Sequence, residues 1–350
     1  MVINSTPVRT CKNFRMNDIE FSEELPSKIE KFENVKIAQE TGKDEVITDF
    51  LFEDFEVKYG TGLISEIKEQ ANQNIRININ SKTDKEIKVE FDFDKENWNL
   101  IDNIEIVAKE DTTSNIYIIY RQRNTENAFH NGLIRVLAET NSKVIVNIVN
   151  LMSNESSNIL SVDSKILDNA SVKFNIIDFG GKTSVTNLYS NVFGKEASSS
   201  INSIYLGTGK ETIDINYIAE MFGEKSKVDM EIQGALKDEA VKHFKGTIDF
   251  KKGCKKASGN EAENCMLLSD KAKSLALPML LCSEEDVEGN HSASSGKADN
   301  KELFYIMTRG FDKKAAEKLL VRAKFNRILE GISNPEIKQE ISYEIDRKLD

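Results

Sequence analysis

The sequence predicts a mainly β protein built from a regular array of short strands. From about residue 74 onward, most segments alternate apolar and polar residues, and alternation with a period of two is typical of strands. These segments begin roughly every 10 to 17 residues, and no helical pattern of normal length lies between them. The regularity leaves three all-β arrangements open, namely a sandwich, a barrel and a stack of coils.

The region before the array, residues 1–73, is polar and acidic and shows one clear helical pattern. In the segment GLISEIKEQANQ, the residues Leu63, Ile64, Ile67 and Ala71 recur at helical spacing. We therefore expect an N-terminal region of helix and irregular structure.

The array itself is rich in Ile, and Asn and Ser are frequent where its segments end. Such residues favour turns, and they are expected where the coils of a solenoid change direction. The predicted strands are NIRININ, EIKVEFDFD, NIEIVAKE, NIYIIYR, LIRVLAE, KVIVNIVNL, SVKFNIIDFG, SINSIYLG, TIDINYIAE and KVDMEIQG.

A short polar stretch separates the array from the C-terminal part of the chain. An acidic run at 283–288 is followed by the Gly- and Ser-rich residues 289–296, which contain His291. Because small flanking residues leave an imidazole accessible, we expect His291 to lie in an exposed loop.

The C-terminal part shows helical patterns with good start signals. Asp299 is a plausible N-cap with Glu302 three residues later, and Arg309-Gly310 is typical of a helix end. Asp312 can cap a second helix, so that the two form a hairpin. Residues 325–349 are expected to continue as two short amphipathic helices that are separated at Asn334-Pro335.

The segment DVEGNHSASSGKADNKELFYIMTRGFDKKAAEKLL, residues 286–320, resembles the C-terminal signature of the SufB/SufD family of SUF iron-sulphur cluster assembly scaffolds. Residues 244–291 extend the resemblance, which is greater to SufD than to SufB. It implies a right-handed parallel β-helix at 74–296, flanked by the N-terminal region 1–73 and by a C-terminal helical domain at 297–350 that docks an ABC ATPase.

The resemblance also implies which residues matter. His291 matches the position at the contact with a SufB-type partner, where it is implicated in cluster formation and could bind metal. Cys265 is a weaker candidate, because it stands five residues before Asp270 and two positions later than the family's cysteine. The residues that match the ATPase-docking hairpin are Leu303, Phe304, Tyr305, Arg309, Gly310 and Phe311.

The function implied is that of a non-catalytic scaffold subunit that pairs with a SufB-like subunit and binds a SufC-like ATPase. It would hold no cluster stably, although a transient one could be shared with the partner. Two alternatives remain open. One is a SufB-like homodimer that carries its own cluster. The other is a β-helix enzyme acting on polysaccharides through Asp178, Asp214 and Asp229, although the single tryptophan offers little for sugar stacking.

Composition restricts the remaining functions. The 47 basic and 58 acidic residues give a net charge of -11, which argues against binding nucleic acid or an anionic membrane. The four cysteines form no C-x-x-C pair, and the N-terminus lacks an apolar signal core, so we expect free thiols in a cytoplasmic protein.

Three other features of the sequence are expected to be structural. His130 in a turn and His243 before a strand are expected to be structural or solvated. The segment GGKT at 180–183 lacks the earlier glycine of a phosphate loop, so a turn is expected there and any ATP would bind to the partner.

Overall fold

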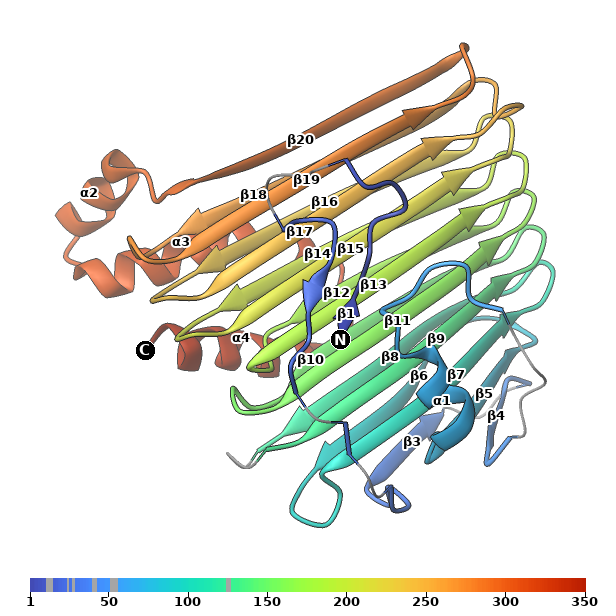
Figure 1. The fold of residues 1–350 in the computed structure, drawn as a ribbon, viewed down its shortest axis with the longest axis horizontal. Coiled ribbons are helices and arrows are strands. Elements are labelled where there is room, and N and C mark those ends of the chain that lie inside the picture. The colour runs from blue at the N-terminus through green and yellow to red at the C-terminus, as the bar shows by residue number, and fades with distance from the viewer. Residues whose placement is uncertain (11–14, 24, 27–28, 40–42, 51–55, 124–126) are drawn as a thin grey trace.

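The protein is a parallel β-solenoid with helices packed along one side (Figure 1). The computed structural model describes residues 1–10, 15–23, 25–26, 29–39, 43–50, 56–123 and 127–350. Each coil contributes one strand to each of two nine-stranded sheets, which we call the even-strand sheet and the odd-strand sheet after the strand numbers. This arrangement decides between the three all-β alternatives in favour of stacked coils.

The even-strand sheet runs from the first coil to the last. Its parallel strands are β6 (Lys82–Phe93), β8 (Thr113–Gln122), β10 (Lys143–Leu151), β12 (Ser171–Asp178), β14 (Ser198–Gly207), β16 (Lys227–Leu236), β18 (Ala257–Leu267) and β20 (Val287–Lys297). A short strand, β3 (Val35–Gln39), adds to β6 in the antiparallel direction.

The odd-strand sheet faces it across the interior, which we call the lumen. Its parallel strands are β5 (Gln73–Ile79), β7 (Asn99–Ala108), β9 (Phe129–Ala138), β11 (Ser157–Ile166), β13 (Thr183–Val192), β15 (Thr212–Met221), β17 (Val241–Phe250) and β19 (Lys273–Cys282). The strand β4 (Glu45–Thr48) pairs antiparallel with β5.

The coils stack in register because equivalent apolar residues fill the lumen. Val144, Val146 and Ile148 on β10 align with Val172, Phe174 and Ile176 on β12, and all six are buried in one continuous core. Each apolar side chain thus packs on its counterpart in the next coil, and together they bury a large apolar area.

The turns between the two sheets also stack. Asn141 and Asn169 adopt left-handed backbone conformations with φ of 59° and 56°, which Asn tolerates better than most residues. The N–H of Asn141 donates to the carbonyl of Asp168 on the next coil at 2.9 Å, and Asn169 donates in the same way to Lys195. The polar segment ends of the sequence are therefore turns, as predicted, and so is Gly181 of the GGKT segment, which has a φ of 108°.

Strands β11 and β13 carry polar ladders that the alternation pattern did not reveal. Asn158 Nδ2 donates to Ser184 Oγ at 2.9 Å, and the hydroxyls of Ser164 and Ser190 lie 2.9 Å apart. All four residues are buried. Stacking satisfies these polar groups, so strands can form without alternating apolar residues.

The N-terminal residues cover the outer face of the odd-strand sheet. Strands β1 (Val2–Ile3) and β2 (Ile19–Glu20) pair with each other, and Asn4 Nδ2 donates to the carboxylate of Asp214 at 2.5 Å. The predicted helix forms as α1 (Ile64–Gln70), which packs on β7 and β9.

The C-terminal helices are α2 (Asn300–Thr308), α3 (Lys313–Leu329) and α4 (Pro335–Leu349), with Asp299, Asp312 and Asn334 as N-caps. The first and second caps are as predicted, but residues 325–329 continue α3 and do not form a separate helix. None of the helices in the described ranges is long and apolar enough to cross a membrane.

Helices α3 and α4 lie on the outer face of the even-strand sheet (Figure 1). Phe325 of α3 stacks on Phe179, just after β12, with ring centroids 5.9 Å apart. Lys348 of α4 donates to Glu211 at 2.8 Å. These two helices therefore cover the side of the solenoid and not its open end, because their apolar faces bury the outer face of the sheet.

Candidate functional site

The last coil of the solenoid, formed by β19 and β20, has no further strand or helix stacked on it in the described part of the chain. Every residue of β20 after Val287 is exposed. We call this surface the uncovered end. A free strand edge presents backbone N–H and C=O groups that can pair with another chain.

His291 lies on β20 and not in a loop, which corrects the sequence prediction. The Gly- and Ser-rich residues around it have low strand propensity, but the ladder with β18 imposes the extended conformation. The accessible position that the sequence predicted is confirmed, because His291 is exposed. The structure gives its ring no hydrogen bond to any described residue.

The register places His291 on the lumen face of β20. It aligns with Glu261 of β18, and Gly289 aligns with Gly259. A side chain at Gly289 would meet Leu280 of β19 and Phe250 of β17 across the lumen. Since side chains two apart on a strand share a face, His291 faces the same way as Gly289.

Below the last coil, the lumen changes from apolar to charged. Glu261 and Glu263 of β18 are 0% and 1% exposed, and Lys242 of β17 is fully buried among them. Glu263 Oε1 accepts from Tyr205 Oη at 2.6 Å and from Lys242 Nζ at 2.8 Å. One lysine therefore faces two carboxylates.

Glu261 has no such partner. Neither of its carboxylate oxygens, nor Oε2 of Glu263, accepts a hydrogen bond from any described residue. Burial, together with the neighbouring charge of Glu263, raises the pKa of Glu261 to about 8. Its carboxylate fills the space in front of Gly246 on β17, where even a Cβ atom would overlap it.

Cys265 lies two residues beyond Glu263 on the same face of β18. It is buried beside Tyr205 and Ser274, and burial raises the pKa of its thiol. The sequence candidates His291 and Cys265 thus lie at the same end of the solenoid, but on different coils and with opposite exposure.

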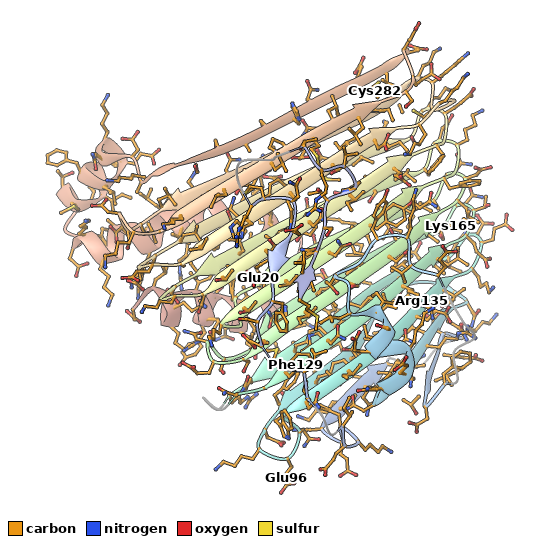
Figure 2. The ribbon with its side chains drawn as sticks, in the orientation of Figure 1. Glu20, Glu96, Phe129, Arg135, Lys165 and Cys282 are labelled. Atoms are coloured by element: carbon orange, nitrogen blue, oxygen red, sulfur yellow. The ribbon has the colours of Figure 1, made fainter. Side chains whose placement is uncertain are left out.

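The other described cysteines are also free thiols, as predicted. Cys254 is buried in the turn after β17, and burial raises the pKa of its thiol to about 11. Cys282 is exposed at the end of β19 (Figure 2), where its thiol lies 2.9 Å from the carbonyl oxygen of Glu284. Cys11 falls outside the described residues.

The remaining histidines are structural, although their predicted places were wrong. His130 lies on β9, fully buried, with Nε2 2.6 Å from Asp102 Oδ1 and Nδ1 2.7 Å from Asn158 Oδ1. His243 lies within β17 and faces Asp214 at 3.7 Å. Across the described ranges, no three Asp, Glu, His or Cys side chains converge as a preformed metal site.

Helix α2 presents apolar side chains to solvent. Phe304 and Tyr305 are 70% and 59% exposed, and Phe311 after the helix is also exposed. Arg309 donates to Tyr305 Oη at 3.0 Å, and Gly310 has a φ of 97°. Leu303 is instead buried beneath the helix. Of the residues predicted to dock an ATPase, Leu303 therefore anchors α2, whereas the aromatic residues are exposed.

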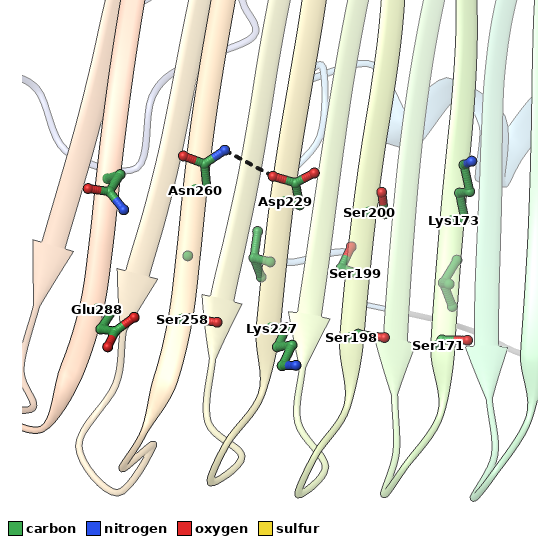
Figure 3. Close-up of a pocket in the computed structure, with 14 residues that line it drawn as sticks. Ser171, Lys173, Ser198, Ser199, Ser200, Lys227, Asp229, Ser258, Asn260 and Glu288 are labelled. Carbon is green, nitrogen blue, oxygen red and sulfur yellow. Dashed lines mark hydrogen bonds between the residues drawn. The ribbon is translucent and has the colours of Figure 1, made fainter. Parts of the chain in front are cut away.

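The three carboxylates that the polysaccharide-enzyme alternative requires do not lie together. Asp178 is buried at the end of β12, whereas Asp214 lies under the N-terminal residues. Asp229 lines a groove of about 330 Å³ on the outer face of the even-strand sheet, where it accepts from Asn260 at 3.0 Å (Figure 3). Lys173, Lys227, Glu288 and several serines also line this groove.

Comparisons with known proteins agree with the fold. Residues 91–324 match the family model described as SUF system FeS cluster assembly, SufBD core domain. The chain is 29% identical to the iron-sulfur cluster assembly protein SufD of Bacillus subtilis over 159 residues, which are 45% of this chain and 36% of that protein.

Two further relatives carry the same description. The SufD protein of Plasmodium berghei is 24% identical over 69% of this chain and 18% of its own length, and that of Escherichia coli is 26% identical over 30% and 25%. The chain thus spans about a third or less of the length of these relatives.

Proposed function

Since the chain belongs to the SufB/SufD family, we propose that it is a SufD-like, non-catalytic scaffold subunit of the SUF iron-sulphur cluster assembly complex. The observation that carries this proposal is the uncovered end, which combines free strand edges with an exposed histidine. A solenoid normally needs such an end to be capped. In this chain a SufB-like subunit would supply the cap.

The site of cluster assembly would then lie between the two subunits. His291 is exposed on the last coil, and a neutral imidazole is a common ligand for iron. Cys265 lies one coil below and is buried, so it would reach a cluster only if β20 moved away from β18. We therefore expect a transient cluster shared with the partner and no cluster on the isolated chain.

A SufC-like ATPase would dock on α2 and the turn that follows it. Phe304, Tyr305 and Phe311 form an exposed aromatic group, and large aromatic side chains are frequent anchors of protein interfaces. Helix α3 fixes this group to the sheet through Phe325, so force on α2 would reach the solenoid directly. ATP-driven movement of the ATPase could thus strain the paired scaffolds.

Co-purification with a SufB-like subunit and a SufC-like ATPase tests this proposal, with light scattering to give the mass of the complex. The full chain is needed, because removal of α2 to α4 would expose the apolar face of the even-strand sheet. The double change Phe304→Ser and Tyr305→Ser should release only the ATPase. The control Tyr343→Ser, an exposed aromatic residue on α4, should release neither partner.

Ala293→Arg tests the uncovered end in the same assay. It places a long charged side chain on exposed β20 and should release only the SufB-like subunit. If the unaltered chain forms a homodimer that retains iron and sulphide, the homodimer alternative is correct. If it binds neither partner and does not dimerise, the scaffold proposal fails.

A further inference from the structure

The lumen below the uncovered end contains more buried carboxyl groups than its cationic side chains pair with. Glu261 and Glu263 are both buried. Among the described residues, Lys242 is the only cation within hydrogen-bonding distance of either, and it binds Glu263. A buried carboxylate without a counter-ion costs several kcal/mol, so such groups normally bind a proton, a cationic side chain or a metal ion. The described residues leave Glu261 with no cationic side chain.

Three carboxylate oxygen atoms in this lumen accept no hydrogen bond from any described residue. They are both carboxylate oxygens of Glu261 and Oε2 of Glu263. The two residues are separated by one position on β18, so their Cβ atoms are roughly 7 Å apart and their side chains can reach a common point. Carboxylate oxygens are hard ligands that suit divalent cations such as Fe²⁺, Mn²⁺ and Mg²⁺.

The surrounding residues position these oxygen atoms. Gly246 lies opposite Glu261, and any larger residue there would collide with the carboxylate. Tyr205 and Lys242 hold Glu263 by Oε1 alone, which leaves Oε2 free. Gly246, Tyr205 and Lys242 thus fix the two side chains while the three oxygens accept no hydrogen bond.

The route from solvent is short. Only the last coil separates Glu261 from the uncovered end, and its lumen-facing residues above the carboxylates are His291 and Ala293 of β20 and Ala276 and Pro278 of β19. His291, Ala293 and Ala276 are all exposed.

We propose that Glu261 and Glu263 form a binding site for a divalent cation inside the solenoid, one coil beneath His291. Water or a group from outside would complete the coordination of the ion. The proposal extends the proposed function, since iron is the metal that cluster assembly consumes, and such a site could hold Fe²⁺ close to His291. It depends on the lumen alone and can be tested without any partner.

Titration of the purified chain with Mn²⁺, followed by electron paramagnetic resonance of the free ion, tests the site. Anaerobic equilibrium dialysis with Fe²⁺ is the parallel measurement. We expect one ion per chain, and Glu261→Gln should weaken binding by about tenfold or more because it removes a charged ligand. Gly246→Ala should weaken binding similarly, because its methyl group displaces the carboxylate without changing any acid.

Two controls locate the site. Glu288→Gln alters an exposed acid of the same end and should leave affinity unchanged. His291→Ala should also retain the affinity, because the ligands lie beneath it. Thermal unfolding of each variant checks that a loss of binding is not a loss of fold.

The proposal is overturned if the unaltered chain binds no more Mn²⁺ or Fe²⁺ than Glu261→Gln does. It is also overturned if His291→Ala abolishes binding while Glu261→Gln and Gly246→Ala preserve it, since the site would then be on the surface. Failure of the chain to bind the SUF partners, by contrast, would refute the scaffold proposal and leave the cation site intact.

Discussion

A buried carboxylate near each end of this solenoid differs in its hydrogen bonding. Near the N-terminal end, Asp102 lies 3.1 Å from Tyr120 Oη, which donates to it, and 2.6 Å from His130 Nε2. At the C-terminal end, Glu261 is equally buried and has no partner among the described residues. The chain therefore supplies hydrogen-bond partners to Asp102 and supplies none to Glu261.

The N-terminal end of the solenoid is covered by other strands, whereas the C-terminal end is not. At the N-terminal end, β3 and β4 pair with β6 and β5, and Phe32 packs edge-on against Phe91 and Phe93. At the C-terminal end, β19 and β20 have no covering strand in the described ranges. The unpartnered carboxylate of Glu261 thus lies at the end that has no covering strand, as expected of an end that receives another molecule.

The largest expected effect comes from reopening the closed end. Phe32 is 1% exposed, so Phe32→Ala should lower the free energy of unfolding by about 3 to 5 kcal/mol. Leu280→Ala removes a partly buried residue of the uncovered end and should cost only about 1 kcal/mol. Urea unfolding of both variants makes the comparison, and equal losses would mean that the two ends contribute alike to stability.

The second effect compares the two carboxylates directly. Asp102→Asn replaces an acceptor of two buried hydrogen bonds and should cost about 3 kcal/mol. Glu261→Gln replaces an unpartnered buried acid, whose raised pKa favours the neutral form, and should leave the free energy of unfolding unchanged or raise it by about 1 kcal/mol. Both are measured by urea unfolding with chelator present. A large loss in Glu261→Gln would show that Glu261 has a stabilising partner.

The third effect depends on pH and concerns the middle of the solenoid. Asp178 accepts from Asn150 and Ser184, yet burial raises its pKa to about 6 from an ordinary value of 3.8. A raised pKa means that the folded state holds the proton more tightly. This contribution is complete below pH 3.8 and is lost as the pH rises through 6.

The difference in unfolding free energy between the unaltered chain and Asp178→Asn should therefore fall by about 3 kcal/mol between pH 3.5 and 6.5. Urea unfolding at several pH values measures it, and groups common to both chains cancel in the difference. A constant difference would show that the two hydrogen bonds hold Asp178 charged throughout.

The sequence predicted the part of the fold that depends on apolar alternation. The Ile-rich strands such as β5, β8 and β10 have the expected places, and Asp299 and Asp312 cap the helices as expected. Strands β11 and β13 were not predicted, because many of their buried positions hold Ser and Asn instead of apolar residues. Such residues are stabilised by neighbours in adjacent coils, which a local pattern does not contain.

The candidate site was predicted only in part, for the same physical reason. His291 was identified through family resemblance, but its strand is imposed by pairing with β18. Glu261 and Glu263 appear in the segment NEAEN, which has the composition of a solvated turn. In the folded chain, β20 stacks above these acids and both are buried. A further signal was Gly246, whose missing side chain makes room for Glu261.

The smallest effect on stability is expected from His291→Ala, and it separates function from folding at the uncovered end. His291 is exposed and its ring has no hydrogen-bond partner among the described residues, so the free energy of unfolding should change by less than about 0.5 kcal/mol. In a complex reconstituted with the two SUF partners, the rate of cluster assembly should fall severalfold.

The matched control is His243→Ala, which removes a half-buried histidine from the outer face of β17. It should leave the rate of assembly unchanged, although burial beside Asp214 makes some loss of stability expected. An unaltered assembly rate in His291→Ala would remove His291 from the proposed function. A loss above about 1 kcal/mol in the isolated chain would instead show that the uncovered end is held together by His291, and the contrast between the two ends would not stand.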